Sequence, residues 1–592
     1  MTRRRAGRLP GVPALGAPAP GAPALGAPAH RVTPPPLAAA PSLAAALALA
    51  VAAAGAAGCG GGTPSPRPGS TAVPPTAAGH RPSPRGPASP AAHDYRWLVA
   101  TSGSPPSIAQ ENRAPGTTAW RLPTAPTNTP GHLDLYVSDQ DVLPGQTETI
   151  YARATPTARA TPTARATPTA RALTIRVYRM GWYGGQGGRL VLQSSPLTPT
   201  RQPPCQHDAR TGLTECRWHP TLQISLPPAL PTGVYIVRAD SDSGARREAL
   251  FVLEQAPRPA PLLAHISTAS YEAYNYWGGD SLYPGGRDRV GVTGTTQGVE
   301  VSYDRPYDST TGAGQFFTRD VAMVRFLERY GYNVSYITTT GLDRRPATAL
   351  IPRLLLDIGH SEYWSQPEET AFARARDHGI NQAFLSSDTL AWRVRLAPAG
   401  PHSSESSHPD HRIIGYKEHV ALDPDRAHPS GPFPHNGAAL TGSAYTGCIT
   451  PRLPVPGRAV YRYYSWAPAP GLRPSWLYAR TGLTAGSRVA GILGYELDQR
   501  TAASPRSTAV VGGGTAPCMP GSRPGRADTT LYRARSGATV FAAGTLGWEL
   551  GLEPVPGASP DAPRRPDPRL VALTRNLLDR LLTATPRPAL SR

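Results

Sequence analysis

The chain has 592 residues, of which 70 are proline and 60 are glycine, so we expect linkers or tails beside two or more domains with large cores. Its formal net charge is +20, carried almost entirely by arginine, because Lys417 is the only lysine. The arginines are scattered and no basic helix or RNA-binding motif accompanies them, so the composition argues against a nucleic-acid partner.

The N-terminus has the pattern of an export signal. Basic residues come first, and an apolar run of small residues, "LAAAPSLAAALALAVAAAGAAGC", ends at Cys59. The tripeptide Ala56-Ala57-Gly58 resembles the lipobox of bacterial lipoproteins, in which the following cysteine carries the lipid. We therefore expect residues 1–59 to be a leader. The protein is then an exported bacterial cell-surface lipoprotein, held to the membrane by lipid on Cys59.

The remaining cysteines follow from this assignment. They are Cys205, Cys216, Cys448 and Cys518. An even number in an exported chain indicates two disulfides, and local order favours Cys205–Cys216 and Cys448–Cys518. Free buried thiols are the alternative.

Residues 60–92 predict a disordered Pro/Gly-rich tether, and residues 93–256 predict a β-sandwich domain. Apolar residues alternate around glycine and proline turns in "HLDLYVSDQDVLPGQTETIYAR", "LTIRVYRMGWYGGQGGRLVLQ", "TGVYIVRAD" and "EALFVLEQ". Short strands with frequent turns and no helical period favour an immunoglobulin-like sandwich. The hexapeptide ATPTAR occurs three times between Ala154 and Arg171 and reads as an expanded hairpin loop without assigned function.

From residue 257 to about 585, strands alternate with helices, and residues 586–592 form a tail. Strands are expected in "PLLAHIST", "NVSYIT", "RLLLDIG" and "QAFLSS". Between them lie an amphipathic helix that ends at Gly331 and a second helix from about Gln366 to His378. This alternation predicts a parallel α/β sheet covered on both faces. Ligands of such sheets bind beyond the carboxyl ends of the strands.

The stretch "GHSEYWS" lies at such a strand end. Ser365 and Glu368 form a capping box, so the helix begins near Gln366 and Gly359–Trp364 is a connecting loop. The stretch nearly matches the G-x-S-x-G elbow of serine hydrolases, but Tyr363 replaces the last glycine and no matching histidine follows. A cysteine nucleophile has less support still. A metal site and an ordinary strand-to-helix connection also fit these residues.

A metal site would use oxygen donors from an upstream segment, "ASYEAYNYWGGDSLYPGG". It carries four tyrosines, which are Tyr271, Tyr274, Tyr276 and Tyr283. Because it follows the first strand of the α/β region, we expect it at the same sheet edge as Glu362. Two phenolates and one carboxylate would balance the charge of ferric iron. Alternatively, these tyrosines pack in an interface or bind glycan.

Five motifs together resemble the large (beta) subunit of N,N-dimethylformamidase and its relatives over about residues 130–582. They are "YRMGWYGGQGGRLV", "AYNYWGGDSLY", "GHSEYWS", "GYELD" and "GTLGWELGL…LTRNLLDRLL". The resemblance implies a β-sandwich followed by a flavodoxin-like domain, similar to class I glutamine amidotransferases without their cysteine. It also implies a mononuclear iron held by two tyrosines and a glutamate. These correspond to Tyr274, Tyr283 and Glu362, with Tyr271 and Tyr276 as the nearest rivals.

The resemblance further implies that His360 and Glu496 assist the reaction. Relatives often carry an asparagine after the next strand, where this chain has Ser387 and Asp388, so the contact that polarises the substrate departs from the pattern. We expect an iron-dependent hydrolase of an amide-like C–N bond. His360 or Glu496 would take a proton from the attacking water and return it to the departing amine.

The partners would be a small amide-like substrate and the membrane, and self-association into a homo-oligomer stays open. The rival function is a non-catalytic cell-surface protein that binds glycan or polymer, or is purely structural.

Overall fold

The computed structural model of the protein describes residues 94–122, 132–154, 170–255, 258–406, 408–455, 460–519, 524–555 and 558–583. The expected leader with Cys59, the tether, most of the ATPTAR repeats and the tail lie outside these residues, so those expectations stay predictions. Within the described residues, no helix has the length and apolar character needed to cross a membrane.

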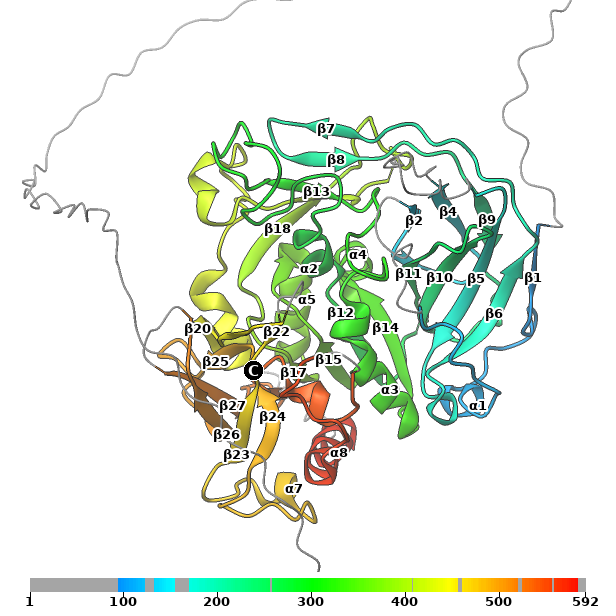
Figure 1. Ribbon diagram of the computed structural model, residues 1–592. Helices are drawn as coiled ribbons and strands as arrows, with labels where there is room; N and C mark the ends of the chain where they lie inside the picture. The colour runs from blue at the N-terminus through cyan, green and yellow to red at the C-terminus, as the bar shows by residue number, and fades with distance from the viewer. Residues whose placement is uncertain are drawn as a thin grey trace, which may run out of the picture. The chain divides into compact units, whose positions relative to one another are not determined.

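The first part of the described chain is built from two sheets (Figure 1). The larger sheet has the order β1 (Tyr95–Trp97), β6 (Gly188–Ser194), β5 (Leu173–Met180), β10 (Gly233–Ser241), β11 (Arg246–Leu253) and β3 (Asp141–Val142). The smaller has the order β2 (Leu133–Val137), β4 (Thr147–Ala154) and β9 (Leu222–Ser225). All neighbours are antiparallel except β11 and β3. The β-rich first part is therefore confirmed.

Alternation along the strands explains how these sheets pack. Tyr235 and Val237 of β10 belong to the core of the first part, together with Ile150 of β4. Val234 and Ile236 point to the opposite face and join the core of the following α/β part. Because the side-chain period of a strand is two residues, one strand contributes to both cores.

A nine-stranded sheet follows. Its order is β14 (Val334–Thr338), β12 (Leu262–Ile266), β15 (Leu354–Ile358), β17 (Asn381–Leu385), β28 (Thr539–Ala542), β27 (Gly525–Arg533), β26 (Ala509–Ala516), β23 (Tyr464–Pro468) and β24 (Val489–Leu493). The first five strands are parallel; the first four are the predicted strands, and β28 is an addition that the sequence did not predict. The prediction of a parallel sheet is wrong for the last four, which pair antiparallel. The turn between β27 and β28 is too short for a crossover helix, and strands joined in this way are antiparallel.

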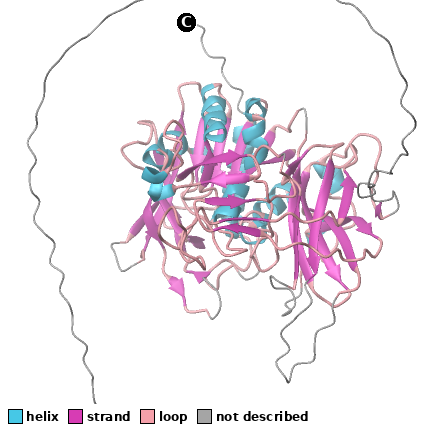
Figure 2. Cartoon of the chain, turned by 90° about the horizontal axis from the view of Figure 1, so that it is seen from above, coloured by secondary structure: helices cyan, strands magenta, loops and turns pink. Residues whose placement is uncertain are grey.

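Helices cover both faces of the parallel half, as predicted; Figure 2 shows them beside the strands. On one face lie α3 (Val321–Arg329) and α8 (Pro568–Thr583), which share a core with Leu354 and Leu356. On the other face α4 (Thr339–Arg344) and α5 (Gln366–Asp377) pack against Leu355. The capping box predicted for α5 is present, since Ser365 and Glu368 bond reciprocally to each other's backbone.

A four-stranded sheet includes Tyr363–Ser365, shortly after β15. Its order is β13 (Glu300–Ser302), β19 (Arg412–Ile414), β18 (Trp392–Ala397) and β16 (Tyr363–Ser365). The prediction of one loop over Gly359–Trp364 is therefore wrong for its last two residues. Tyr363 and Trp364 are fully buried and pair in parallel with β18, a partner that appears only later in the chain.

Both predicted disulfides are confirmed. Cys205–Cys216 brackets the hairpin of β7 (Gln206–Asp208) and β8 (Leu213–Glu215), and Cys448–Cys518 joins cysteines 70 residues apart. Cys448 lies in β20 (Ala444–Ile449), which pairs with β25 (Glu496–Gln499). This disulfide therefore supports the strand that carries Glu496.

Candidate metal centre

The loop that carries His360 and Glu362 turns sharply at the end of β15. Gly359 has φ +73°, and a Cβ there would lie 2.2 Å from Oδ1 of Asp320, so no other residue fits without displacement. The Gly359 N–H donates to Oε1 of Glu549 at 2.9 Å. Glu549 belongs to the "GWEL" stretch, to which the sequence reasoning attached no role.

Two phenols converge on Glu362. The Tyr274 hydroxyl donates to Oε2 of Glu362 at 2.6 Å, and the Tyr283 hydroxyl donates to Oε1 at 2.5 Å. The two hydroxyl oxygens are 2.8 Å apart, and the rings stack with centroids 4.3 Å apart. Tyr274 directly follows α2 (Thr268–Ala273), which comes after β12. The structure thus brings together three oxygen donors from two distant segments.

The rival tyrosines lie elsewhere. Tyr271 is buried and its hydroxyl donates to the carboxylate of Asp320. The Tyr276 hydroxyl donates to the backbone carbonyl of Pro284 at 2.8 Å, in an exposed loop. Neither hydroxyl is bonded to Glu362.

His360 and Glu496 complete the predicted group. His360 Nε2 lies 3.1 Å from Oε2 of Glu496 and 3.5 Å from Oε2 of Glu362. His360 Nδ1 lies 3.2 Å from Oε1 of Gln315. We assign the imidazole proton to Nδ1, because an amide oxygen can only accept, and this leaves a lone pair on Nε2. Gln315 was not foreseen from the sequence.

Burial dominates the electrostatics of the centre. It lowers the pKa of His360 to about 4 and raises the pKa of Glu496 to about 8, since each charged form is poorly solvated. Burial, reinforced by the Glu362 carboxylate, also raises the pKa values of Tyr274 and Tyr283. A cation bound here would favour the phenolate and carboxylate forms and lower the pKa values of Tyr274, Tyr283 and Glu496 again, while it would keep His360 neutral.

Several buried polar atoms at the centre have unused bonding capacity. His360 Nε2 and Glu496 Oε2 lie 3.1 Å apart without forming a hydrogen bond, and Asp388 Oδ1 has no hydrogen-bond partner among the described residues. One ligand atom from each of these three residues lies within 4.8 Å of the others. Beside them, the hydroxyls of Tyr274 and Tyr283 and the carboxylate of Glu362 form a donor set that fits a metal ion, because three oxygen donors from two distant segments meet at one point.

The centre opens into a pocket of about 620 Å³. Besides Tyr274, Tyr283, Glu362 and Glu496, its lining includes Asp388, Trp392, Lys417, Glu418, Asn436 and Tyr445. Several of these come from the loop-rich stretch after residue 400, in which no sequence motif marks them. A larger hollow of about 1340 Å³ lies around Arg473, Arg533 and Arg580, away from these groups.

Lys417 is the lining residue with the most unusual setting. It is buried, it has φ +53°, and its Nζ lies 3.3 Å from the centroid of the Tyr283 ring. The Trp392 ring is 5.0 Å away. In the sequence, Lys417 stands out only as the single lysine. In the structure, its ammonium group lies over the ring of Tyr283, which is a candidate metal ligand.

The family of the chain follows from a comparison of sequences. The family model described as "N,N-dimethylformamidase beta subunit-like, C-terminal" matches residues 174–562. The chain belongs to this family. The matched range includes every residue of the candidate centre.

Two further comparisons add little to this family assignment. A search of curated proteins finds no match. A crystal structure of a cycloisomaltooligosaccharide glucanotransferase from Paenibacillus sp., complexed with cycloisomaltoheptaose, matches with 9% identity and a TM-score of 0.15. That match covers 70% of this chain and 68% of the other, and at this TM-score it carries no argument.

In this dimethylformamidase-like chain, Ser361 does not face the pocket. It is fully buried, its hydroxyl donates to Oδ1 of Asp357 at 2.7 Å, and the Trp364 indole donates to it at 3.0 Å. A nucleophile must reach the substrate, so this geometry does not support a serine hydrolase.

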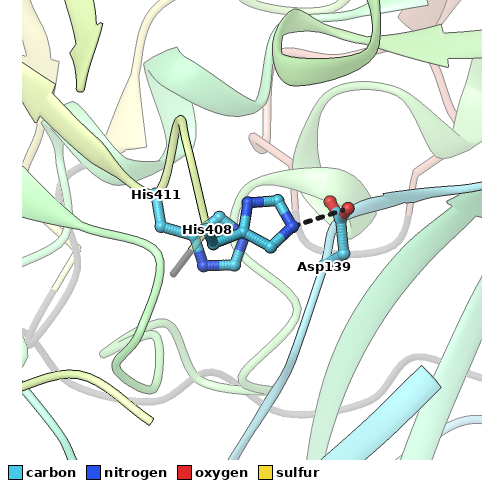
Figure 3. Close-up of side chains that lie close together, drawn as sticks. All are labelled: Asp139, His408 and His411. Carbon is cyan, nitrogen blue, oxygen red and sulfur yellow. Dashed lines mark ion pairs between the residues drawn. The ribbon is translucent and has the colours of Figure 1, made fainter. Parts of the chain in front are cut away.

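A second cluster of possible metal ligands, Asp139, His408 and His411, lies outside the pocket (Figure 3). His408 Nε2 lies 3.2 Å from Oδ2 of Asp139, and the His408 and His411 rings stack with centroids 3.6 Å apart. Arg344, however, donates to both Asp139 oxygens at 2.6 and 2.7 Å. Since the guanidinium already neutralises this carboxylate, we interpret the group as an ion-pair network.

Proposed function

We propose that this protein is an iron-dependent hydrolase of an amide-like C–N bond. The observation that carries the proposal is the convergence of the Tyr274 and Tyr283 hydroxyls on Glu362 in a chain of the dimethylformamidase-like family. We further propose an immunoglobulin-like sandwich over residues 93–256 and an α/β domain over 257–585 that is similar to class I glutamine amidotransferases. The two packed sheets and the five parallel strands support these finer assignments.

The donor set favours iron in its ferric state. Two phenolates and one carboxylate carry three negative charges, and such hard oxygen donors suit a trivalent ion better than the nitrogen and sulfur sets typical of zinc. Ferric iron, when bound by Tyr274, Tyr283 and Glu362, supplies Lewis acidity that polarises an amide carbonyl.

The neighbouring residues handle the proton. His360 Nε2 carries the free lone pair beside Glu362 and Glu496, which line the pocket, and accepts a proton from the attacking water, while Gln315 holds the tautomer. Glu496, 3.1 Å from His360, lies where it can pass that proton to the departing nitrogen. The water oxygen joins the carbonyl carbon, the C–N bond breaks, and the products are a carboxylic acid and an amine.

The test uses the full chain with Glu362→Ala. We expect wild-type protein to bind iron and to show a tyrosinate-to-iron charge-transfer colour, and the variant to lose both. Glu369→Ala, on the first turn of α5, is the matched control and keeps them. Iron content that is unchanged in Glu362→Ala contradicts the ligand assignment. A panel of small amides then tests the hydrolysis.

We also propose that lipid on Cys59 anchors the enzyme at the cell surface. The two disulfides support an exported location, because such bonds persist in oxidising compartments. Cys59→Ser should release the protein from the membrane fraction, and light scattering of the released protein tests the homo-oligomer. The rival function, a non-catalytic protein that binds glycan or polymer or is structural, predicts neither iron nor colour.

A further inference from the structure

The pocket lining includes one buried carboxylate that the proposed reaction does not use. Asp388 is only 4% exposed, it lines the pocket, and its Oδ1 has no hydrogen-bond partner within the described part of the chain. A buried acceptor without a donor destabilises the folded state. Such an atom at a pocket wall indicates that a bound molecule supplies the donor.

The backbone holds Asp388 in a strained position. It follows β17 and adopts φ +54°, in the left-handed region that few non-glycine residues occupy. Its N–H donates to Oδ1 of Asp498 at 2.8 Å, and the Ser387 hydroxyl donates to the same oxygen at 3.1 Å. Asp498 therefore keeps the Asp388 side chain at the pocket. Strain maintained in this way is characteristic of functional sites.

Asp388 lies within reach of the atoms that handle the proton. A carboxylate oxygen of Asp388, a ring nitrogen of His360 and a carboxylate oxygen of Glu496 lie within 4.8 Å of one another. A nitrogen atom at hydrogen-bond distance, about 2.9 Å, from two such atoms spans this separation. The amide nitrogen that receives a proton from Glu496 is therefore also within reach of Asp388.

We propose that Asp388 accepts a hydrogen bond from the N–H of the substrate amide, so that the enzyme selects primary and secondary amides over N,N-disubstituted ones. An N,N-dialkyl amide has no such donor and would leave the carboxylate buried and unpaired. Sites built to bond a substrate N–H reject analogues that lack it. As the departing nitrogen gains its proton, the bond to Asp388 becomes charge-assisted and stronger. This substrate class rests on the proposed function.

Two variants at Asp388 separate hydrogen bonding from steric selection. Asp388→Gly removes the acceptor and suits the left-handed backbone, since glycine has no Cβ. Asp388→Asn keeps the volume and a neutral acceptor, and asparagine also tolerates this backbone. Asp377→Asn, which removes an exposed carboxylate on α5, is the control.

The experiment measures N-methylacetamide and N,N-dimethylacetamide binding to the full chain by ligand-observed NMR, with kcat/KM determined in parallel. We expect wild type and Asp377→Asn to prefer N-methylacetamide at least about tenfold. The preference should fall to about twofold in Asp388→Gly. In Asp388→Asn it should lie between this value and the wild-type preference. All variants should retain wild-type iron.

Three results would overturn the inference. They are equal wild-type affinities, an undiminished preference in Asp388→Gly, and loss of iron in Asp388→Asn, which would make Asp388 a metal ligand. A binding preference without hydrolysis of either amide has a different meaning. It would contradict the proposed function and leave recognition of the N–H by Asp388 in place.

Discussion

The Tyr283 hydroxyl lies 2.5 Å from Oε1 of Glu362, although 79 residues separate them in the chain. The contact arises because β12 and β15 are adjacent parallel strands whose ends are in register, with Ile266 opposite Ile358. The segments that leave these two strand ends meet above the sheet edge. Residues that are remote in sequence thus become candidate ligands of one ion.

The first prediction concerns the phenols. Tyr274→Phe or Tyr283→Phe removes an anionic ligand, so iron affinity should fall more than about a hundredfold, beyond the 10–100-fold typical of a lost outer contact to a ligand. Elemental analysis after dialysis and the visible absorption of the protein measure this loss. Tyr276→Phe, whose hydroxyl donates to a backbone carbonyl and not to Glu362, should retain iron. An equal loss in all three variants would show that the phenols act through folding.

The second prediction concerns Lys417. A cation over an aromatic ring is worth about 0.5–2 kcal/mol, and more if the ring is a phenolate. Lys417→Met should therefore weaken iron binding about tenfold. It should also move the charge-transfer band to longer wavelength, because the phenolate of Tyr283 loses a stabilising charge. Lys417→Arg keeps the charge and should keep most of the band position. An unshifted band in Lys417→Met would exclude this role.

The third prediction concerns the contact between the first sheet and the α/β part. Arg179 of β5 and Glu328 of α3 are fully buried and form two bonds, of 2.8 and 2.9 Å. Glu328→Gln leaves the buried guanidinium without its counter-ion, so the free energy of unfolding should fall by about 3–5 kcal/mol in chemical denaturation. The exposed Arg376–Asp377 pair offers the comparison, and Asp377→Asn should cost less than about 1 kcal/mol.

The fourth prediction concerns pH. His265 lies between Asp357 and Glu368, at 2.8 and 2.6 Å. Burial opposes its charged form, but the carboxylates outweigh burial and raise the pKa of His265 to about 10. The folded state thus binds the proton more tightly than the unfolded chain, whose histidine pKa is about 6.5.

The stability that this proton contributes is fully present below about pH 6.5 and is lost as pH rises through about 10. The free energies of unfolding of wild type and His265→Gln, measured between pH 6 and 11, should therefore approach each other as the pH rises from about 6.5 to about 10. A difference that stays constant with pH would show that His265 is neutral in the folded protein.

The sequence by itself determined the features that depend on near neighbours. The capping box of Ser365 and Glu368, the end of α3 before Gly331 and the two disulfide pairings all follow from residue types at short spacing or in local order. The parallel half of the sheet was predictable for the same reason, because alternating strands and helices leave few topologies. The place of Glu362 beyond a strand end also follows from this pattern.

Only the tertiary structure decided which side chains meet. Tyr271 and Tyr274 could not be told apart from the sequence, yet of these two only Tyr274 bonds Glu362. At the end of α2 the Tyr274 hydroxyl points to the centre, whereas the Tyr271 hydroxyl points to Asp320. Lys417 and Asp388 reach the pocket through strained backbones that no local pattern reveals. These contacts depend on the register of strands paired across long sequence separations, so no local stretch of residues encodes them.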